Sequence, residues 1–117
     1  MAQREQVPRL RDDSLKDLQR QLRQFAAERA WEPFHTPRNL AALIASEAGE
    51  LLALYRWGEE AITNHPDDVS RELADVFLGV LRFADVTGID LLRAGNEKIA
   101  LNALKYPVER GSESDRG

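Results

Sequence analysis

The sequence predicts an all-α protein built as a four-helix bundle. Apolar residues recur at three- and four-residue spacing in four stretches of the 117-residue chain, and proline or glycine separates these stretches. No alternating pattern of apolar and polar residues is long enough for a β-strand. A chain of this length fits one domain with a modest core.

The first helix is expected from Ser14 to about Ala30. Ser14 suits a helix cap, and the apolar positions that follow keep helical spacing: Leu15, Leu18, Leu22 and Phe25. Pro33 and Pro37 then break the helix, so the residues between the first two helices form a loop.

The second and third helices have clear start and stop signals. Thr36 and Pro37 suit the cap and first turn of the second helix, which is expected to end near Trp57 and Gly58. Pro66 opens the third helix, and a glycine at position 88 ends it.

The fourth helix is expected to open at Asp90 and to stop at Pro107. Residues 14–108 therefore form the expected helical domain. The polar segments 1–13 and 109–117 contain few apolar residues, and we expect little order there.

Composition excludes several classes of function. The formal net charge of −4 argues against a nucleic acid polymer as partner, and the absence of cysteine excludes disulfides and thiolate zinc sites. No apolar run approaches the roughly 20 residues of a membrane span, and the charged N-terminus lacks the apolar core of a signal peptide. We expect a cytoplasmic protein.

Two helices carry acids on their apolar stripes. Glu47 lies within the first stripe and Glu50 at its edge, while Glu72 lies within the second and Asp75 flanks it. The stripes themselves consist of Leu40, Leu43, Ile44, Leu51 and Leu54 in one helix and Val69, Leu73, Val76, Val80 and Phe83 in the other. Carboxylates facing a core are costly to desolvate unless something pairs them.

Hard divalent cations, which prefer oxygen ligands, are one remedy for four converging acids. The alternative is ion pairing across the bundle with Arg56, Arg71 or Lys98. A di-iron carboxylate bundle would need Glu-x-x-His on two helices. The chain has one such string, from Glu32 to His35, and it contains a proline, which argues against this class.

The order of ExxE, a spacer and ExxD resembles the MazG-like all-α nucleoside triphosphate pyrophosphohydrolases, closest to the dCTP pyrophosphatase branch. Four segments carry the resemblance: FAAERAWEPFHTPRNL at 25–40, SEAGELLALYRW at 46–57, ELADV at 72–76 and NALKYPV at 102–108. ExxE alone is common on helices, whereas the combination is specific and covers roughly residues 15–108.

The resemblance implies a Mg²⁺-dependent enzyme that cleaves a nucleoside triphosphate to a monophosphate and pyrophosphate, in nucleotide pool control or house-cleaning. The expected substrate is dCTP or a modified pyrimidine deoxynucleotide. The implied metal ligands are Glu47, Glu50, Glu72 and Asp75, of which Glu47 and Glu50 are also the candidate catalytic residues; the identity of the general base stays open. The resemblance also implies a homodimer or homotetramer.

The resemblance further implies six substrate-binding residues, namely Trp31, His35, Trp57, Lys98, Asn102 and Tyr106. An indole offers a flat face on which a base can stack. The alternatives are that the tryptophans anchor a core or an interface, that His35 bonds to backbone, and that the helix face of Lys98 is solvated. Arg38 contacts phosphate or caps structure; the sequence does not separate these.

Two positions depart from the dCTP-type pattern. Leu22 stands where close relatives have a histidine, and Gly79 where they have a tyrosine. We therefore expect weaker cytosine preference, with Gly79 leaving room for a bulkier base. The competing interpretation of the whole chain is a non-catalytic helical interaction module whose acids form salt bridges.

Overall fold

The computed structural model describes residues 12–109 and confirms the all-α prediction. Its elements in chain order are α1 (Asp12–Glu28), the 3₁₀ helix η2 (Glu32–Phe34), α2 (Pro37–Ala53), α3 (Ala61–Asn64), α4 (Pro66–Thr87) and α5 (Leu91–Lys105). No strand occurs in this range. Among the described helices, none has the length and apolar character needed to cross a membrane. Expectations for residues 1–11 and 110–117 lie outside the described part of the chain.

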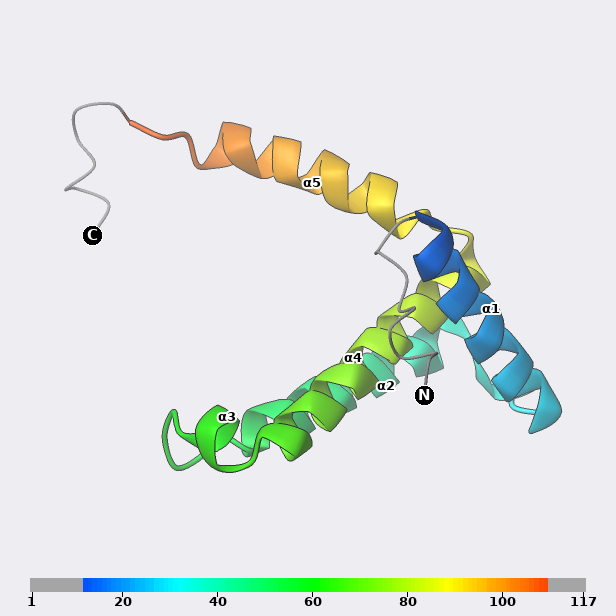
Figure 1. Ribbon diagram of the computed structural model, residues 1–117. Coiled ribbons are helices and arrows are strands. Elements are labelled where there is room, and N and C mark those ends of the chain that lie inside the picture. The colour runs from blue at the N-terminus through cyan, green and yellow to red at the C-terminus, as the bar shows by residue number, and fades with distance from the viewer. Residues whose placement is uncertain (1–11, 110–117) are drawn as a thin grey trace, which may run out of the picture.

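α2 and α4 form the central pair of the fold and lie side by side (Figure 1). The Thr36 hydroxyl accepts the N–H of Asn39 at 3.2 Å and caps α2, as predicted. α4 begins at its predicted proline and ends at Gly88, whose φ of 76° suits a glycine after a helix. Leu40 of α2 and Leu81 of α4 are fully buried, so the core lies on this pair.

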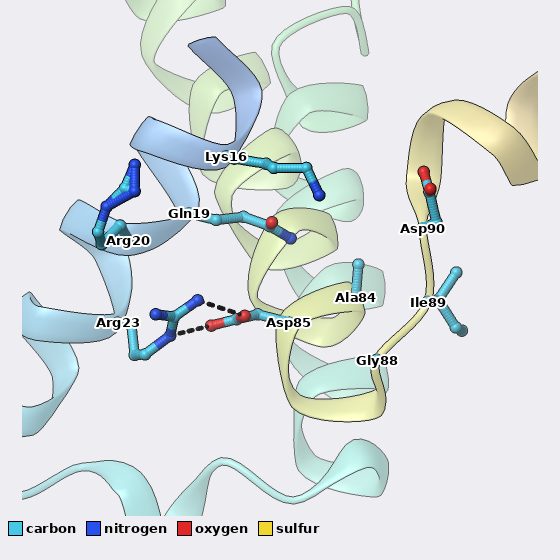
Figure 2. A pocket seen from close by; sticks show the side chains of 9 residues that line it. All are labelled: Lys16, Gln19, Arg20, Arg23, Ala84, Asp85, Gly88, Ile89 and Asp90. Carbon is cyan, nitrogen blue, oxygen red and sulfur yellow. Dashed lines mark hydrogen bonds and ion pairs between the residues drawn. The ribbon is translucent and has the colours of Figure 1, made fainter. Parts of the chain in front are cut away.

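α1 packs against α4 through apolar and polar contacts. Ala26 is buried, and the side-chain amide of Gln19 donates to the backbone carbonyl of Leu81 at 3.1 Å. Arg23 Nε and Nη2 each donate to a separate oxygen of Asp85 at 2.8 Å, which makes the pair bidentate (Figure 2). Two such contacts to one helix fix the position of α1 on α4.

α5 forms where the sequence predicts it but extends away from α2 and α4 (Figure 1). Asp90 caps it by accepting the N–H of Arg93 at 3.1 Å. None of its residues is buried, and Ile99 and Leu104 are 70% and 80% exposed. Within one chain, the packed part of the bundle therefore consists of α1, α2, α4 and the short helix α3, whose Ala61 is buried.

Two helix boundaries differ from the predicted ones, and the structure contains a further short helix. α1 begins at Asp12, so Ser14 lies inside the helix instead of capping it. α2 ends at Ala53, because the N–H of Leu54 bonds to the carbonyl of Leu51 and tightens the last turn before the chain reaches Trp57. The short helix α3 was not predicted from the sequence.

Gly79 lies where α4 comes closest to α2. A Cβ atom added to this buried residue would lie 3.1 Å from Ile44 Cγ1 and 3.9 Å from Ile44 Cα. A side chain at this position would therefore point at α2, and the glycine allows the two helices to approach.

Replacing Gly79 with leucine is expected to lower the free energy of unfolding by about 1–3 kcal/mol, because the added carbons overpack the contact with Ile44. Chemical denaturation monitored by circular dichroism measures the change. Gly95→Leu is the matched control, since no atom lies within 4 Å of a Cβ built there. Equal stability of the two variants would contradict the close-approach role of Gly79.

Candidate active site

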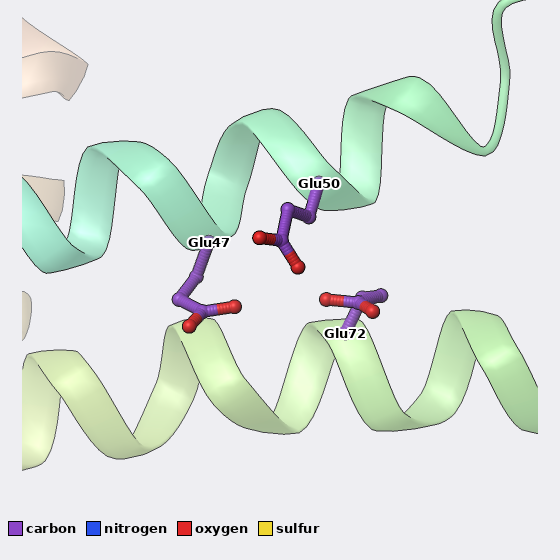
Figure 3. A group of neighbouring side chains, drawn as sticks. All are labelled: Glu47, Glu50 and Glu72. Atoms are coloured by element: carbon purple, nitrogen blue, oxygen red, sulfur yellow. The ribbon is translucent and has the colours of Figure 1, made fainter.

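Acids from α2 and α4 converge in the space between these helices. Figure 3 shows Glu47 and Glu50 of α2 and Glu72 of α4 extending toward one another. One carboxylate oxygen from each lies within 4.8 Å of those from the other two. The i, i+3 spacing on α2 places its two acids on one face, and the close approach of α4 supplies the third.

The acids repel one another, and their repulsion is visible in the pKa values of two of them. Burial raises the pKa of the Glu47 carboxyl, and the charges of Asp75 and Glu50 raise it further. Burial also raises the pKa of Glu72, followed by the charges of Glu50, Asp75 and Glu47. Within residues 12–109, no hydrogen-bond partner reaches Oε1 of Glu47 or Oε1 of Glu72, although both atoms are buried.

The proposed ion pairs with basic residues are not formed in the described part of the chain. Arg71 pairs with Asp68 at 3.5 Å, and Arg56 Nε donates to the carbonyl of Ala53. Lys98 lies on α5, which extends away from the acids. Among the described residues, none of these three basic side chains therefore pairs with the acidic group.

Asp75, the fourth predicted acid, lies one turn after Glu72 on α4 and outside the close group of three. It lines a cavity together with Glu47, and its charge contributes to the raised pKa of both Glu47 and Glu72. Asp75 therefore faces the same region and connects the acids to that cavity.

The cavity beside the acids has a volume of about 300 Å³ and is mainly apolar. We call it the slot; its lining consists of Leu22, Phe25, Ala26, Trp31, His35, Leu40, Leu43, Glu47, Asp75, Leu78, Gly79 and Arg82. The rings of Trp31 and His35 lie 6.0 Å apart, and Phe25 meets Trp31 edge-on at 5.6 Å. The slot therefore combines flat aromatic surface with acids at one side.

The slot includes both positions that depart from the dCTP-type pattern, Leu22 and Gly79. Leu22 gives the slot apolar surface at the position where the dCTP-type pattern would place a histidine. At Gly79 the missing side chain would have pointed at Ile44, so its absence serves helix packing as well as space in the slot.

Arg82 is a slot residue that the sequence reasoning missed. It is 7% exposed, and its Nε donates to His35 Nδ1 at 2.9 Å. The available signal was a basic residue inside the apolar run FLGVLRFA at 77–84, which is unusual because buried arginine is costly unless paired.

Four predicted substrate-binding residues lie away from the slot within one chain. Trp57 is 90% exposed and follows the carboxyl end of α2, and it is not among the residues that line the slot. Lys98, Asn102 and Tyr106 lie on or just after α5 and are exposed. The structure thus brings together the acids, Trp31 and His35 but not these four.

Comparison with known proteins finds relatives that share much of this sequence. The chain is 37% identical over 110 residues to dCTP pyrophosphatase 1 of Rattus norvegicus and 35% identical over 112 residues to that of Homo sapiens, which covers 86% and 90% of the chain. The chain spans 65% and 66% of the length of these curated relatives. No model of a known protein family matches the chain.

One solved structure is matched over its whole length. The crystal structure of a pyrophosphatase from Archaeoglobus fulgidus superimposes with a TM-score of 0.79 at 31% sequence identity, over 87% of this chain and 100% of that one. Because the match includes the whole of that pyrophosphatase, and two paired helices here carry the acidic motif, the chain belongs to the MazG-like family of all-α pyrophosphatases.

Proposed function

We propose that this protein is a Mg²⁺-dependent nucleoside triphosphate pyrophosphohydrolase that releases a monophosphate and pyrophosphate. The observation that carries the proposal is the group of Glu47, Glu50 and Glu72, whose oxygens converge within 4.8 Å without a cationic partner in the described residues. Acids in this arrangement suit an oxygen-seeking dication and, through it, a triphosphate.

The residues fit a magnesium site. Glu47 Oε1 and Glu72 Oε1 are buried and find no hydrogen-bond partner among the described residues, and such carboxylate oxygens are the kind of donor that a hard cation satisfies. Glu50 and Asp75 complete the proposed ligand set. When bound, Mg²⁺ would neutralise phosphate charge and lower the pKa of a bound water. The side chains themselves hold and orient the ligand, and Glu47 or Glu50 would accept the proton of the attacking water.

We further propose that a pyrimidine deoxynucleotide, dCTP or a 5-modified form, is the preferred substrate. Support comes from the names of the curated relatives and from the slot, where Trp31 and His35 lie beside Glu47 and Asp75. A base stacked on Trp31 would place its triphosphate toward the acids. Such a substrate is drawn from the cytoplasmic nucleotide pool, and the cytoplasm is the location we propose.

A homodimer or homotetramer is the proposed assembly. Large apolar side chains on and after α5 are more than 40% exposed, namely Leu92, Ile99, Leu101, Leu104, Tyr106 and Val108. A second copy of the chain would cover them and add a fourth helix to the bundle. Lys98, Asn102 and Tyr106 would then be carried to a slot, where they could contact phosphate and sugar.

Pyrophosphate release from the four ordinary deoxynucleoside triphosphates and from 5-methyl-dCTP, with and without Mg²⁺, tests the function. We expect Mg²⁺-dependent release, led by dCTP and 5-methyl-dCTP by a small margin, because stacking tolerates any base and Leu22 offers no edge contact. A purine triphosphate with the highest kcat/KM would overturn the substrate. No release from any triphosphate would favour the non-catalytic interaction module.

A further inference from the structure

The slot contains a buried arginine, Arg82, whose guanidinium contacts two side chains. The Arg82 side chain is 8% exposed, and its Nη1 lies 3.3 Å from Asp85 Oδ2 while its Nε donates to His35 Nδ1 at 2.9 Å. A guanidinium has only donors and stays charged in proteins. The nitrogen it contacts on His35 must therefore be an acceptor.

This contact determines the protonation of the histidine ring. A neutral imidazole carries its single proton on one nitrogen, and the partner of the other nitrogen decides which. Because Nδ1 accepts from Arg82, the proton of His35 resides on Nε2. Burial lowers the pKa of His35, and the positive charge of Arg82 lowers it further, so the ring is held neutral.

Arg82 is itself held in place from the other side. Asp85 lies between Arg82 and Arg23, and its bidentate bond to Arg23 connects α1 to α4 (Figure 2). The hydrogen bond from Arg23 and the charges of both arginines lower the pKa of Asp85, so its carboxylate stays ionised. The series Arg23, Asp85, Arg82 and His35 thus runs from the surface of α1 to the slot.

We propose that Arg82 is a positioning residue for base selection: by occupying Nδ1 it presents His35 to the slot as an Nε2–H donor, which favours a base edge that offers an acceptor there. The inference rests on the proposed function, since it assumes that a nucleotide base occupies the slot. A donor that cannot become an acceptor penalises any base whose edge places an amino group opposite it, because two donors would then face each other unpaired.

The tautomer can be measured independently of catalysis. Long-range ¹H–¹⁵N spectra of the wild-type protein at neutral pH distinguish Nδ1–H from Nε2–H, and His35→Gln assigns the signals because His65 is the only other histidine. We expect Nε2–H for His35. An Nδ1–H tautomer in the wild-type protein would overturn the proposal whatever the protein hydrolyses.

The kinetic arm compares Arg82→Met with Arg82→Lys and Arg23→Gln. Arg82→Met removes the donor and keeps an unbranched side chain, while Asp85 retains Arg23 as its partner. For Arg82→Met we expect a mixture of His35 tautomers. The KM for the best deoxynucleotide should rise about tenfold with kcat little changed. The values of kcat/KM for the four bases should differ less from one another than in the wild type. Arg82→Lys should restore part of the selectivity.

Arg23→Gln is the matched control, because it removes the Arg23–Asp85 bond and leaves the Arg82–His35 bond intact. In this variant, the His35 tautomer and the spread of kcat/KM across the four bases should stay those of the wild type. If the spread of kcat/KM across the four bases is the same in Arg82→Met as in the wild type, the inference is overturned. If Arg82→Met does not fold, the inference is tested by the kcat/KM values of Arg82→Lys and by the His35 tautomer in the wild-type spectra. Wild-type protein that releases no pyrophosphate would refute the proposed function, while the tautomer measurement would still stand.

Discussion

Replacing Glu47 with glutamine is expected to lower Mg²⁺-dependent kcat/KM by about 100-fold or more, the scale seen when one electrostatic stabiliser is lost. The side-chain shape is kept, so the helix pair should form normally. The lost charge comes from a carboxylate whose oxygen is one of three converging carboxylate oxygens. Pyrophosphate release measured over a range of Mg²⁺ concentrations should also show weaker metal dependence.

The same variant is expected to melt at a higher temperature than the wild type without metal. Burial and neighbouring acids raise the folded-state pKa of Glu47 above its value in the unfolded chain. The folded protein therefore binds more protons, and its stability falls as pH rises through the window between the two pKa values. The gain from Glu47→Gln should be full above that window and vanish as pH falls below it.

Asp68→Asn provides a control for both readouts, because it removes one negative charge from α4 at an exposed ion pair with Arg71. Turnover should stay close to the wild-type value, and Tm should change little. Near-normal activity of Glu47→Gln at saturating Mg²⁺ would show that Glu47 is not a metal ligand. A lower Tm without metal would show that its charge is compensated in the folded protein.

The elements of the fold that local chemistry determines were predictable from the sequence. Caps and breakers fixed the start of α2 at Pro37, the span of α4 from Pro66 to Gly88 and the start of α5 after Asp90. Helical spacing also identified the acids, since Glu47 and Glu72 interrupt apolar stripes. Both features depend on residues close together in the chain.

Features that depend on contacts between distant residues were not predictable in this way. The pairing of Arg82 with His35 joins residues 47 positions apart and needs the packed structure to be seen. Gly79 is explained by Ile44 on another helix, and the position of Trp57 follows from an early end of α2. In the proposed oligomer, the place of α5 would depend on a partner surface that periodicity does not specify.

Replacing Ile99 with aspartate is expected to dissociate the proposed oligomer and to reduce turnover strongly. Ile99 is 70% exposed on α5, in a helix with no buried residue, so an acid there costs the isolated chain little. In an assembled interface the same carboxylate would be buried without a partner, which is highly unfavourable. Sedimentation velocity should show a shift toward monomer.

Loss of activity should follow dissociation if α5 delivers substrate contacts. Lys98 and Asn102 lie on the same helix as Ile99 and away from the slot of their own chain in the described structure. Arg93→Asp is the matched control, because it places the same acid on α5 at a position that is already polar and paired with Glu97. It should keep both assembly and turnover. A fully active monomer of Ile99→Asp would show that one chain completes the site alone, and α5 would then have no role in the reaction.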